Sequence, residues 1–215
     1  MHGSIPSLLA PTLALSLCAA CGALQQALGP GGTREPIIPD DPAFELTYVP
    51  DLPVSRPPFD EVHASWKQRL DQPYVFFEHF GSYTETGALI PALHRELLAQ
   101  GLAPAGAPFC LFYDDPGKTA VAELRSRACI PITGPRSPLA PLRYEVLPST
   151  TVAYAFVSGH YPDVPRAYPG VYAFMNRMGW VENGPIREIY LVPPGANPKP
   201  DALLCEVQVP ATTAR

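Results

Sequence analysis

Beyond about residue 60, hydrophobic positions recur at two spacings along the chain. A spacing of three and four residues, typical of a helix with one buried face, appears twice, in 89–101 and in 171–179. Each of these runs ends at a glycine, a residue that often follows the last turn of a helix. Strand-like hydrophobic runs, bounded by turn-forming residues, occupy 62–70, 74–80, 109–114, 120–133, 142–147, 152–158, 187–192 and 203–209.

The two helical runs divide these strands into two similar halves. Each half has the order strand, strand, helix, strand, strand, and a Gly-x-Tyr sequence precedes each helix. The glycines of the two sequences, Gly81 and Gly159, lie 78 residues apart. The pattern therefore predicts an α+β fold made of a duplicated β-β-α-β-β unit. Such a unit would form an antiparallel sheet with two helices on one face and a pseudo-two-fold axis between the halves.

The last two strands separate their polar residues from their apolar ones, because successive side chains of a strand point to opposite faces. Ile189 and Leu191 are expected to face the helices. Glu188 and Tyr190 would then share the opposite face. Glu206, in the last strand, is also expected on this face, which no predicted helix covers. Two carboxylates are therefore expected to project from the uncovered face of the sheet.

The first 60 residues differ in composition from the rest. Residues 1–21 contain an uncharged apolar stretch that is short for a membrane span and ends in small residues, as a signal for export does. Its ending resembles a bacterial lipobox, in which Cys21 becomes the lipid-modified first residue of an exported, periplasm-facing or cell-surface lipoprotein. A cleaved secretory signal, and an uncleaved or absent one, are the alternatives. Residues 22–60 are rich in proline and glycine and are expected to form an extended tether, which leaves 61–212 as the folded domain.

Composition narrows the class of function. A net charge of −5 without a basic stripe disfavours a nucleic-acid partner, whereas 47% hydrophobic residues are enough for a packed core. The five histidines and the cysteines have no metal-ligand spacing, so neither a metal nor another cofactor is expected. Cys110, Cys129 and Cys205 are expected to be small buried residues, although any two of them could pair in an oxidising compartment.

Several short motifs, in this order, resemble the GyrI-like (gyrase-inhibitor-like) effector-binding domain family. They are Gly159-His160-Tyr161, then Gly184-Pro185-Ile186-Arg187-Glu188-Ile189-Tyr190, then Glu206-Val207-Gln208-Val209-Pro210, with Phe80-Gly81-Ser82-Tyr83 and Tyr113-Asp114-Asp115-Pro116 in the first half. The similarity covers residues 60 to 210. It implies duplicated modules around an aromatic cleft on the pseudo-two-fold axis, which binds small organic and often cationic or planar molecules. A minority of the family hydrolyse their ligands. Many members carry an N-terminal helix-turn-helix domain, whereas this chain has the signal and tether there, so transcription regulation is not supported.

The resemblance also assigns candidate binding residues. Glu188 matches the glutamate of the cleft, and Tyr190, Tyr113 and Trp180 are the aromatic candidates. Glu206 is a candidate second acid, with a solvated or arginine-paired side chain as the alternative.

Three hypotheses for the function follow. The first is an exported, lipid-anchored protein that captures a small aromatic or cationic organic molecule in its central cleft. The second is a hydrolase of an electrophilic small molecule with Glu188 as general base. The third is an envelope interaction protein with a vestigial cleft. The sequence leaves the ligand and the oligomeric state open.

Overall fold

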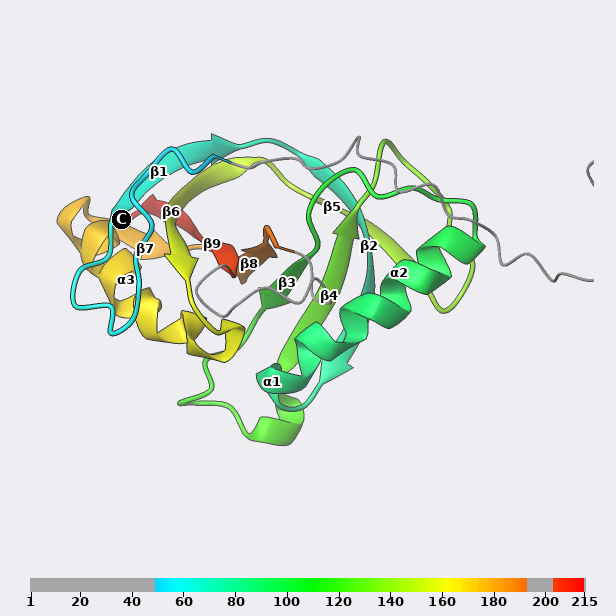
Figure 1. The fold of residues 1–215 in the computed structure, drawn as a ribbon, viewed down its shortest axis with the longest axis horizontal. Coiled ribbons are helices and arrows are strands. Elements are labelled where there is room, and N and C mark those ends of the chain that lie inside the picture. The colour runs from blue at the N-terminus through cyan, green and yellow to red at the C-terminus, as the bar shows by residue number, and fades with distance from the viewer. Residues whose placement is uncertain (1–48, 193–202, 215) are drawn as a thin grey trace, which may run out of the picture. The chain divides into compact units, whose positions relative to one another are not determined.

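The computed structural model of the chain describes residues 49–192 and 203–214. In these residues, antiparallel strands form one curled sheet, a half-barrel, on which helices pack (Figure 1). The strands are β1 (Ala64–Arg69), β2 (Gln72–Phe80), β3 (Phe109–Phe112), β4 (Arg125–Pro131), β5 (Arg143–Leu147), β6 (Thr150–Ser158), β7 (Trp180–Glu182), β8 (Ile186–Tyr190) and β9 (Leu204–Thr213). The helices are α1 (Tyr83–Thr86), α2 (Ile90–Ala99) and α3 (Tyr168–Arg177). The predicted mixed α and β class is confirmed, and the short strand β7 was not predicted.

The two longer helices lie where their hydrophobic spacing predicts them. Leu93 and Leu97 of α2 are completely buried, and the chain leaves this helix through Gly101 at a φ of +69°. Such a left-handed backbone is strained for other residues, so glycine suits this position. The third helix follows a 3₁₀ segment (Tyr161–Ala167) and begins at Tyr168, shortly before the predicted run. Pro169 lies in its first turn. Proline is tolerated there because the first turn needs no backbone N–H donor.

One long bent ribbon holds the two ends of the sheet together. The strand order is β1-β6-β9-β8-β3-β4-β2-β5, with β7 paired to β9. Arg69 of β1 pairs with Thr150 of β6, and Gln72 of β2 pairs with Leu147 of β5. The same register thus continues across the short links β1–β2 and β5–β6, which run together over the top of the view in Figure 1. The turns expected near residues 72 and 149 are therefore bends within this ribbon.

Both faces of the sheet are buried in its centre, and the helices cover one of them. We call this the helix face: its core joins the buried side chains of α2 and α3 to those of the strands, including Val207 and Tyr190. The opposite face, here the second face, has its own apolar cluster, formed by Tyr74, Phe76, Phe109, Leu111, Cys129, Leu147 and Ile189. Strand alternation is therefore observed, but with apolar residues on both sides of the sheet.

The predicted orientation of β8 is wrong. Glu188 and Tyr190 lie on the helix face, and Ile189 lies on the second face. Glu188 is paired across the ladder with Val207, and Glu206 with Ile189, so the two glutamates lie on opposite faces. The prediction assumed that the apolar side of β8 must face the helices, whereas the second face has an apolar core of its own.

The described residues before β1 lie against the sheet. The backbone N–H of Ser55 donates to the carbonyl of Phe156 at 2.8 Å, and the N–H of Ser158 donates to the carbonyl of Ser55 at 3.0 Å. The hydroxyl of Tyr154 donates to Asp51 at 2.9 Å. Part of the predicted tether thus pairs with β6. The predicted signal, with Cys21, and the rest of the tether as far as residue 48 lie outside the described residues.

The three cysteines of the domain, Cys110, Cys129 and Cys205, are free and buried, as expected for small core residues. In the part of the chain that the structure describes, no helix is long and apolar enough to cross a membrane. Nor do three or more potential metal-binding side chains gather anywhere in these residues.

Candidate functional site

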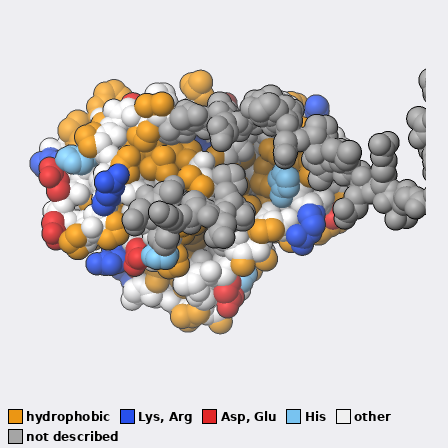
Figure 2. All heavy atoms as spheres, viewed as in Figure 1, with side chains coloured by type: hydrophobic (Ala, Val, Ile, Leu, Met, Phe, Trp, Pro, Cys, Tyr) orange, Lys and Arg blue, Asp and Glu red, His pale blue; other side chains and the backbone are white. Residues whose placement is uncertain are grey.

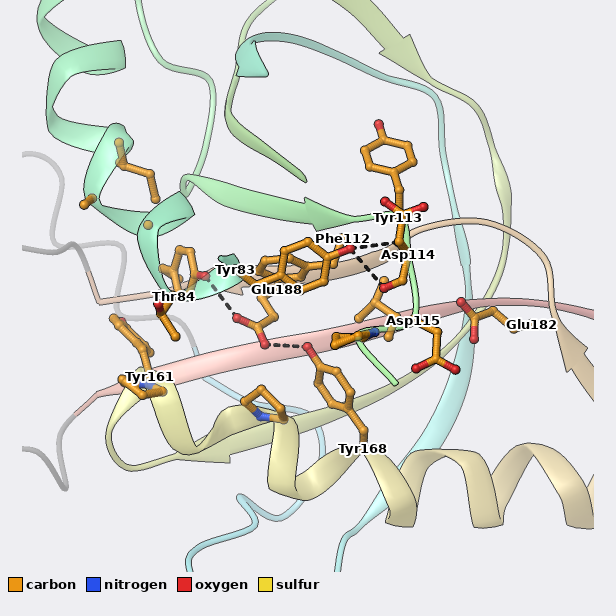
Figure 3. Close-up of a pocket in the computed structure, with 18 of the residues that line it drawn as sticks. Tyr83, Thr84, Phe112, Tyr113, Asp114, Asp115, Tyr161, Tyr168, Glu182 and Glu188 are labelled. Atoms are coloured by element: carbon orange, nitrogen blue, oxygen red, sulfur yellow. Dashed lines mark hydrogen bonds between the residues drawn. The ribbon is translucent and has the colours of Figure 1, made fainter. Parts of the chain in front are cut away.

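A pocket of about 780 Å³ lies on the helix face, where the N-terminal ends of the helical segments meet the central strands β3 and β8 (Figure 3). Strand β8 contributes Glu188 and Tyr190, and β3 contributes Phe112. The remaining lining residues come from the helical segments, from the loop after β3, and from the end of β7 and the start of β8. They are Tyr83, Thr84, Gly87, Ala88, Ile90, Pro91, Tyr161, Pro162, Pro165, Tyr168 and Tyr172, then Tyr113, Asp114, Asp115 and Pro116, and finally Glu182 and Ile186. The volume suits a small organic molecule.

Glu188 is the most deeply buried charged side chain of the pocket, with 3% of its surface exposed. Its carboxylate accepts hydrogen bonds from the hydroxyl of Tyr168 at 2.6 Å and from that of Tyr190 at 3.0 Å (Figure 3). No ion pair joins it to a Lys, Arg or His among residues 49–192 and 203–214. Desolvation raises the pKa of Glu188 to about 7, and the two tyrosine hydrogen bonds oppose this rise. The group therefore changes its charge near neutral pH.

Aromatic rings form much of the pocket wall. The rings of Tyr161 and Tyr190 lie 4.7 Å apart, and those of Tyr83 and Phe112 lie 4.8 Å apart. The hydroxyl of Tyr83 donates to the carbonyl of Asp114 at 2.9 Å, which holds this ring against the end of β3. These rings provide flat surfaces against which an aromatic ligand or an organic cation can stack.

The charge of the pocket is negative. Four carboxylates line it, those of Asp114, Asp115, Glu182 and Glu188, and its lining includes no Lys, Arg or His. The exposed Asp115 pairs with Lys118 at 2.9 Å, and Glu182 accepts a hydrogen bond from Tyr172 at 2.5 Å. Only Glu188 combines full burial with a position among the aromatic rings. An aromatic cavity with an excess of acidic groups favours cations over anions.

Of the residues that the sequence assigned to the cleft, Glu188 and Tyr190 lie together in the pocket. Tyr113 also belongs to its lining, but its ring points away from Glu188 and has the guanidinium of Arg125 over it at 4.1 Å (Figure 3). Trp180 is not among the lining residues and packs edge-on against Trp66, with 6.2 Å between the ring centres.

Glu206, the other predicted acid, lies on the second face. Its carboxylate pairs with Lys67 at 2.6 Å and accepts a hydrogen bond from the side chain of Gln208 at 2.7 Å. It is buried, with 3% of its surface exposed. This is the paired environment that the sequence analysis kept as the alternative, except that the partner is lysine.

Sequence reasoning missed Tyr168, the nearer of the two hydroxyls that hold Glu188. It also treated none of Phe112, Tyr161 and Tyr172 as cleft residues. One signal was partly present: Tyr172 lies in the predicted helical run 171–179, and Tyr168 lies four residues before it, a spacing that places both on one face once the helix begins at Tyr168. Which face this is depends on how the helix packs on the sheet.

The chain was compared with known protein families and structures. The sequence model of the GyrI-like small molecule binding domain matches residues 66–212. The chain belongs to this family. The search of curated proteins found no match.

Solved structures of GyrI-like fold are similar over most of the domain. The crystal structure of the EcmrR C-terminal domain has a TM-score of 0.64 and 16% identity, covering 71% of this chain and 99% of that chain. EcmrR in a cryo-EM complex with DNA has a TM-score of 0.63 and 17% identity, covering 70% of this chain and 57% of that one. A hydrolase from Listeria innocua has a TM-score of 0.51 and 8% identity, covering 69% of this chain and 91% of that one. At these identities the likeness establishes the fold alone.

The described surface in the view of Figure 2 carries basic and acidic side chains side by side. Lys and Arg side chains occur singly or in small groups, with Asp and Glu near several of them and hydrophobic side chains between them. DNA-binding surfaces instead gather positive charge along one face. The visible face therefore adds no support for a nucleic-acid partner.

Proposed function

We propose that this GyrI-like domain binds a small aromatic or cationic organic molecule in the pocket around Glu188. The observation that carries the proposal is a buried carboxylate that receives hydrogen bonds from two tyrosines but has no cation beside it in the described structure. Burying an unpaired carboxylate is unfavourable, and a positively charged guest would offset that penalty. The aromatic rings supply the apolar contacts for the rest of such a guest.

We also propose that the pocket lies on a pseudo-two-fold axis between two copies of one unit. The strand order supports this, since β6-β9-β8 on one side is mirrored by β2-β4-β3 on the other. The central pair is then β8 and β3, which supply Glu188 and Phe112 to the pocket.

The test compares N-methylquinolinium with methylnaphthalene, its neutral isostere, by equilibrium titration. At pH 8 the cation is expected to bind roughly tenfold more tightly, the effect of a partly desolvated charge contact. At pH 6 most of the Glu188 carboxyl is protonated, because its pKa is about 7. The affinity for the cation should then fall roughly fivefold, because the ionised fraction drops about tenfold while the protonated form still binds the cation about as well as the neutral isostere, whose affinity is unaffected. Equal affinities at pH 8 would contradict the proposal.

A hydrolase is the second candidate. Two hydroxyls within hydrogen-bond reach of Glu188, and a pKa near neutrality, are also what a general base requires. Turnover of an electrophilic ester by the wild-type protein, lost in Glu188→Gln, would favour this candidate over simple binding.

The cellular part of the proposal is an exported protein anchored through a lipid on Cys21. It rests on the apolar, uncharged stretch that ends at this cysteine. Fatty-acid labelling in a bacterial host is expected for the wild-type chain and should be abolished in Cys21→Ala. The Cys21→Ala protein should also be released from the membrane fraction. An unlabelled wild-type protein that keeps Met1 would contradict export.

A further inference from the structure

Two buried arginines on the second face form no ion pair with a carboxylate of the described residues. Arg187 of β8 and Arg69 at the end of β1 have 4% and 8% of their surfaces exposed. No ion pair joins either of them to an acidic residue in the described parts of the chain. Burying a charged group is costly unless it is paired and hydrogen-bonded, so two such groups close together call for an explanation.

Arg187 is held in place by neutral contacts. Its guanidinium lies over the ring of Phe109 at 3.9 Å, and its Nη2 donates to Oε1 of Gln72. Its Nε is buried and has no hydrogen-bond partner. Burial, and next the positive charge of Arg69, lower the pKa of Arg187 to about 10. The two guanidinium groups are therefore near enough to repel each other.

Arg69 lies on the same face and has more unused donors. Lys67, two residues earlier in β1, contacts Glu206 on the second face, and strand alternation places Arg69 on that face too. Its Nη2 donates to the carbonyl of Pro148 at 2.8 Å, but its Nε and Nη1 are buried without a partner. Together the two arginines leave three buried N–H-bearing nitrogens unused, and an unmade hydrogen bond of this kind costs roughly 1–3 kcal/mol.

A third arginine of the second face shows how the chain neutralises such a charge elsewhere. Arg127 lies over the ring of Phe76 at 4.0 Å, much as Arg187 lies over Phe109. Arg127 nevertheless pairs with Glu145 at 2.5 Å and with Glu78 at 3.3 Å. Among the buried arginines of the described residues, only Arg69 and Arg187 therefore lack an ion pair, and the charge of Glu206 only partly opposes the lowered pKa of Arg187.

A hollow of about 330 Å³ opens beside Arg69, at the bend of the ribbon, and Arg187 is not among its lining residues. Arg69 lines it together with Gln72, whose side chain contacts Arg187. One acidic residue, Asp71, is also among its lining residues; its carboxylate accepts a hydrogen bond from the backbone N–H of Ser149 at 2.5 Å. The space is several times the volume of a water molecule, about 30 Å³, and holds a group the size of a phosphate.

We infer that this hollow, which shares no lining residue with the Glu188 pocket, is a second binding site for an oxyanion such as a phosphate or carboxylate group, with Arg69 as its ligand and Arg187, behind Gln72, adding positive charge. An oxyanion there supplies negative charge beside two buried guanidinium groups that have no ion pair among the described residues. The planar guanidinium group suits this recognition, because its N–H groups match the spacing of two oxygens on one anion. The inference is independent of the function proposed for the pocket.

The test uses the full-length chain and inorganic phosphate, titrated at constant ionic strength with chloride as the balancing salt. Phosphate is expected to raise the melting temperature by a few degrees, because a ligand that binds only the folded state stabilises it. Sulfate should act similarly. In Arg69→Gln, the phosphate affinity is expected to fall at least roughly tenfold, since a charge-assisted pair of hydrogen bonds is lost. Arg187→Gln should weaken phosphate binding by a smaller factor, because Arg187 does not line the hollow and acts there only through its charge.

Arg136→Gln is the matched control. This substitution removes the same unit of charge as Arg69→Gln. Arg136 is exposed and does not line the hollow. Its substitution should leave the phosphate affinity within about twofold, because surface charges at a distance are screened by salt. Phosphate and sulfate that stabilise no more than chloride would overturn the inference. So would an equal loss of affinity in Arg69→Gln and Arg136→Gln, which would show attraction by net charge alone.

Discussion

Glu188→Gln is expected to make the ligand-free protein more stable at pH 8 and, at the same time, to abolish the preference of the pocket for cations. The glutamine keeps the volume of the side chain. Its Oε1 can accept a hydrogen bond from one of the two hydroxyls, Tyr168 or Tyr190, and its amide N–H can donate to the other, which then accepts. It removes a buried charge that the wild-type protein must carry above neutral pH. Chemical denaturation and titration with the quinolinium and naphthalene pair measure the two effects in one set of samples.

The direction of the stability change follows from the pKa. The pKa of Glu188 is raised from 4.5 to about 7, so the folded state holds its proton more tightly than the unfolded state does. This contribution to stability is fully present below pH 4.5 and is lost as the pH rises through 7. A shift of this size corresponds to about 3 kcal/mol, so Glu188→Gln should gain up to that amount over the wild type at pH 8 and little at pH 4.

Glu206→Gln is the matched control for this prediction. It is the same substitution at an equally buried glutamate, but on the opposite face and beside Lys67. It is expected to reduce stability, because Lys67 loses its buried partner, and to leave the cation preference of the pocket unchanged. A Glu188→Gln protein that still prefers the cation, or that is less stable than the wild type at pH 8, would show that Glu188 is a structural residue and not the cation ligand.

The helices and most strands could be predicted from the sequence because their signals are local. Leu93 and Leu97 are four residues apart and both fully buried, and Gly101 takes the left-handed backbone that its place after the helix requires. Pairings between strands that are distant in the sequence give no such local signal. The link between β1 and β2 looks like a tight turn, and only the continued pairing of Gln72 with Leu147 shows that it is a bend in one ribbon.

The orientation of Glu188 could not be predicted for a related reason. Alternation correctly separates Glu188 from its neighbour Ile189, but both side chains are buried, with 3% and 9% of their surfaces exposed. When a strand has apolar neighbours on both sides, the pattern does not say which side the helices cover. The pairing of Glu188 with Tyr168 depends on that choice, and so does the separation of Glu188 from Glu206.

Arg127→Met is expected to lower the free energy of unfolding by about 2 kcal/mol, less than the roughly 3–5 kcal/mol of a fully buried ion pair, because the side chain of Glu145 is 49% exposed. Arg127 has 8% of its surface exposed, pairs with Glu78 and Glu145, and donates to the hydroxyl of Tyr74 at 2.9 Å. Methionine fills most of the space over Phe76 but leaves these acceptors without their donor. Arg143→Met is the control, since Arg143 pairs with the same Glu78 but has a side chain 63% exposed. An exposed pair contributes about 0–1 kcal/mol, so this variant should stay near the wild type.

The pH dependence separates a lost ion pair from a lost packing contact in Arg127→Met. Desolvation alone would raise the pKa of Glu145, but its hydrogen bond and attraction to Arg127 lower it overall. The stability that this carboxylate contributes is therefore present above its ordinary pKa of 4.5 and is lost as the pH falls through the lower value of the folded state. Denaturation curves should show the gap between wild type and Arg127→Met narrowing in acid. A gap that stays constant from neutral pH to below that value would mean that Arg127 acts through its packing on Phe76, and the charge pair with Glu145 would then contribute nothing measurable.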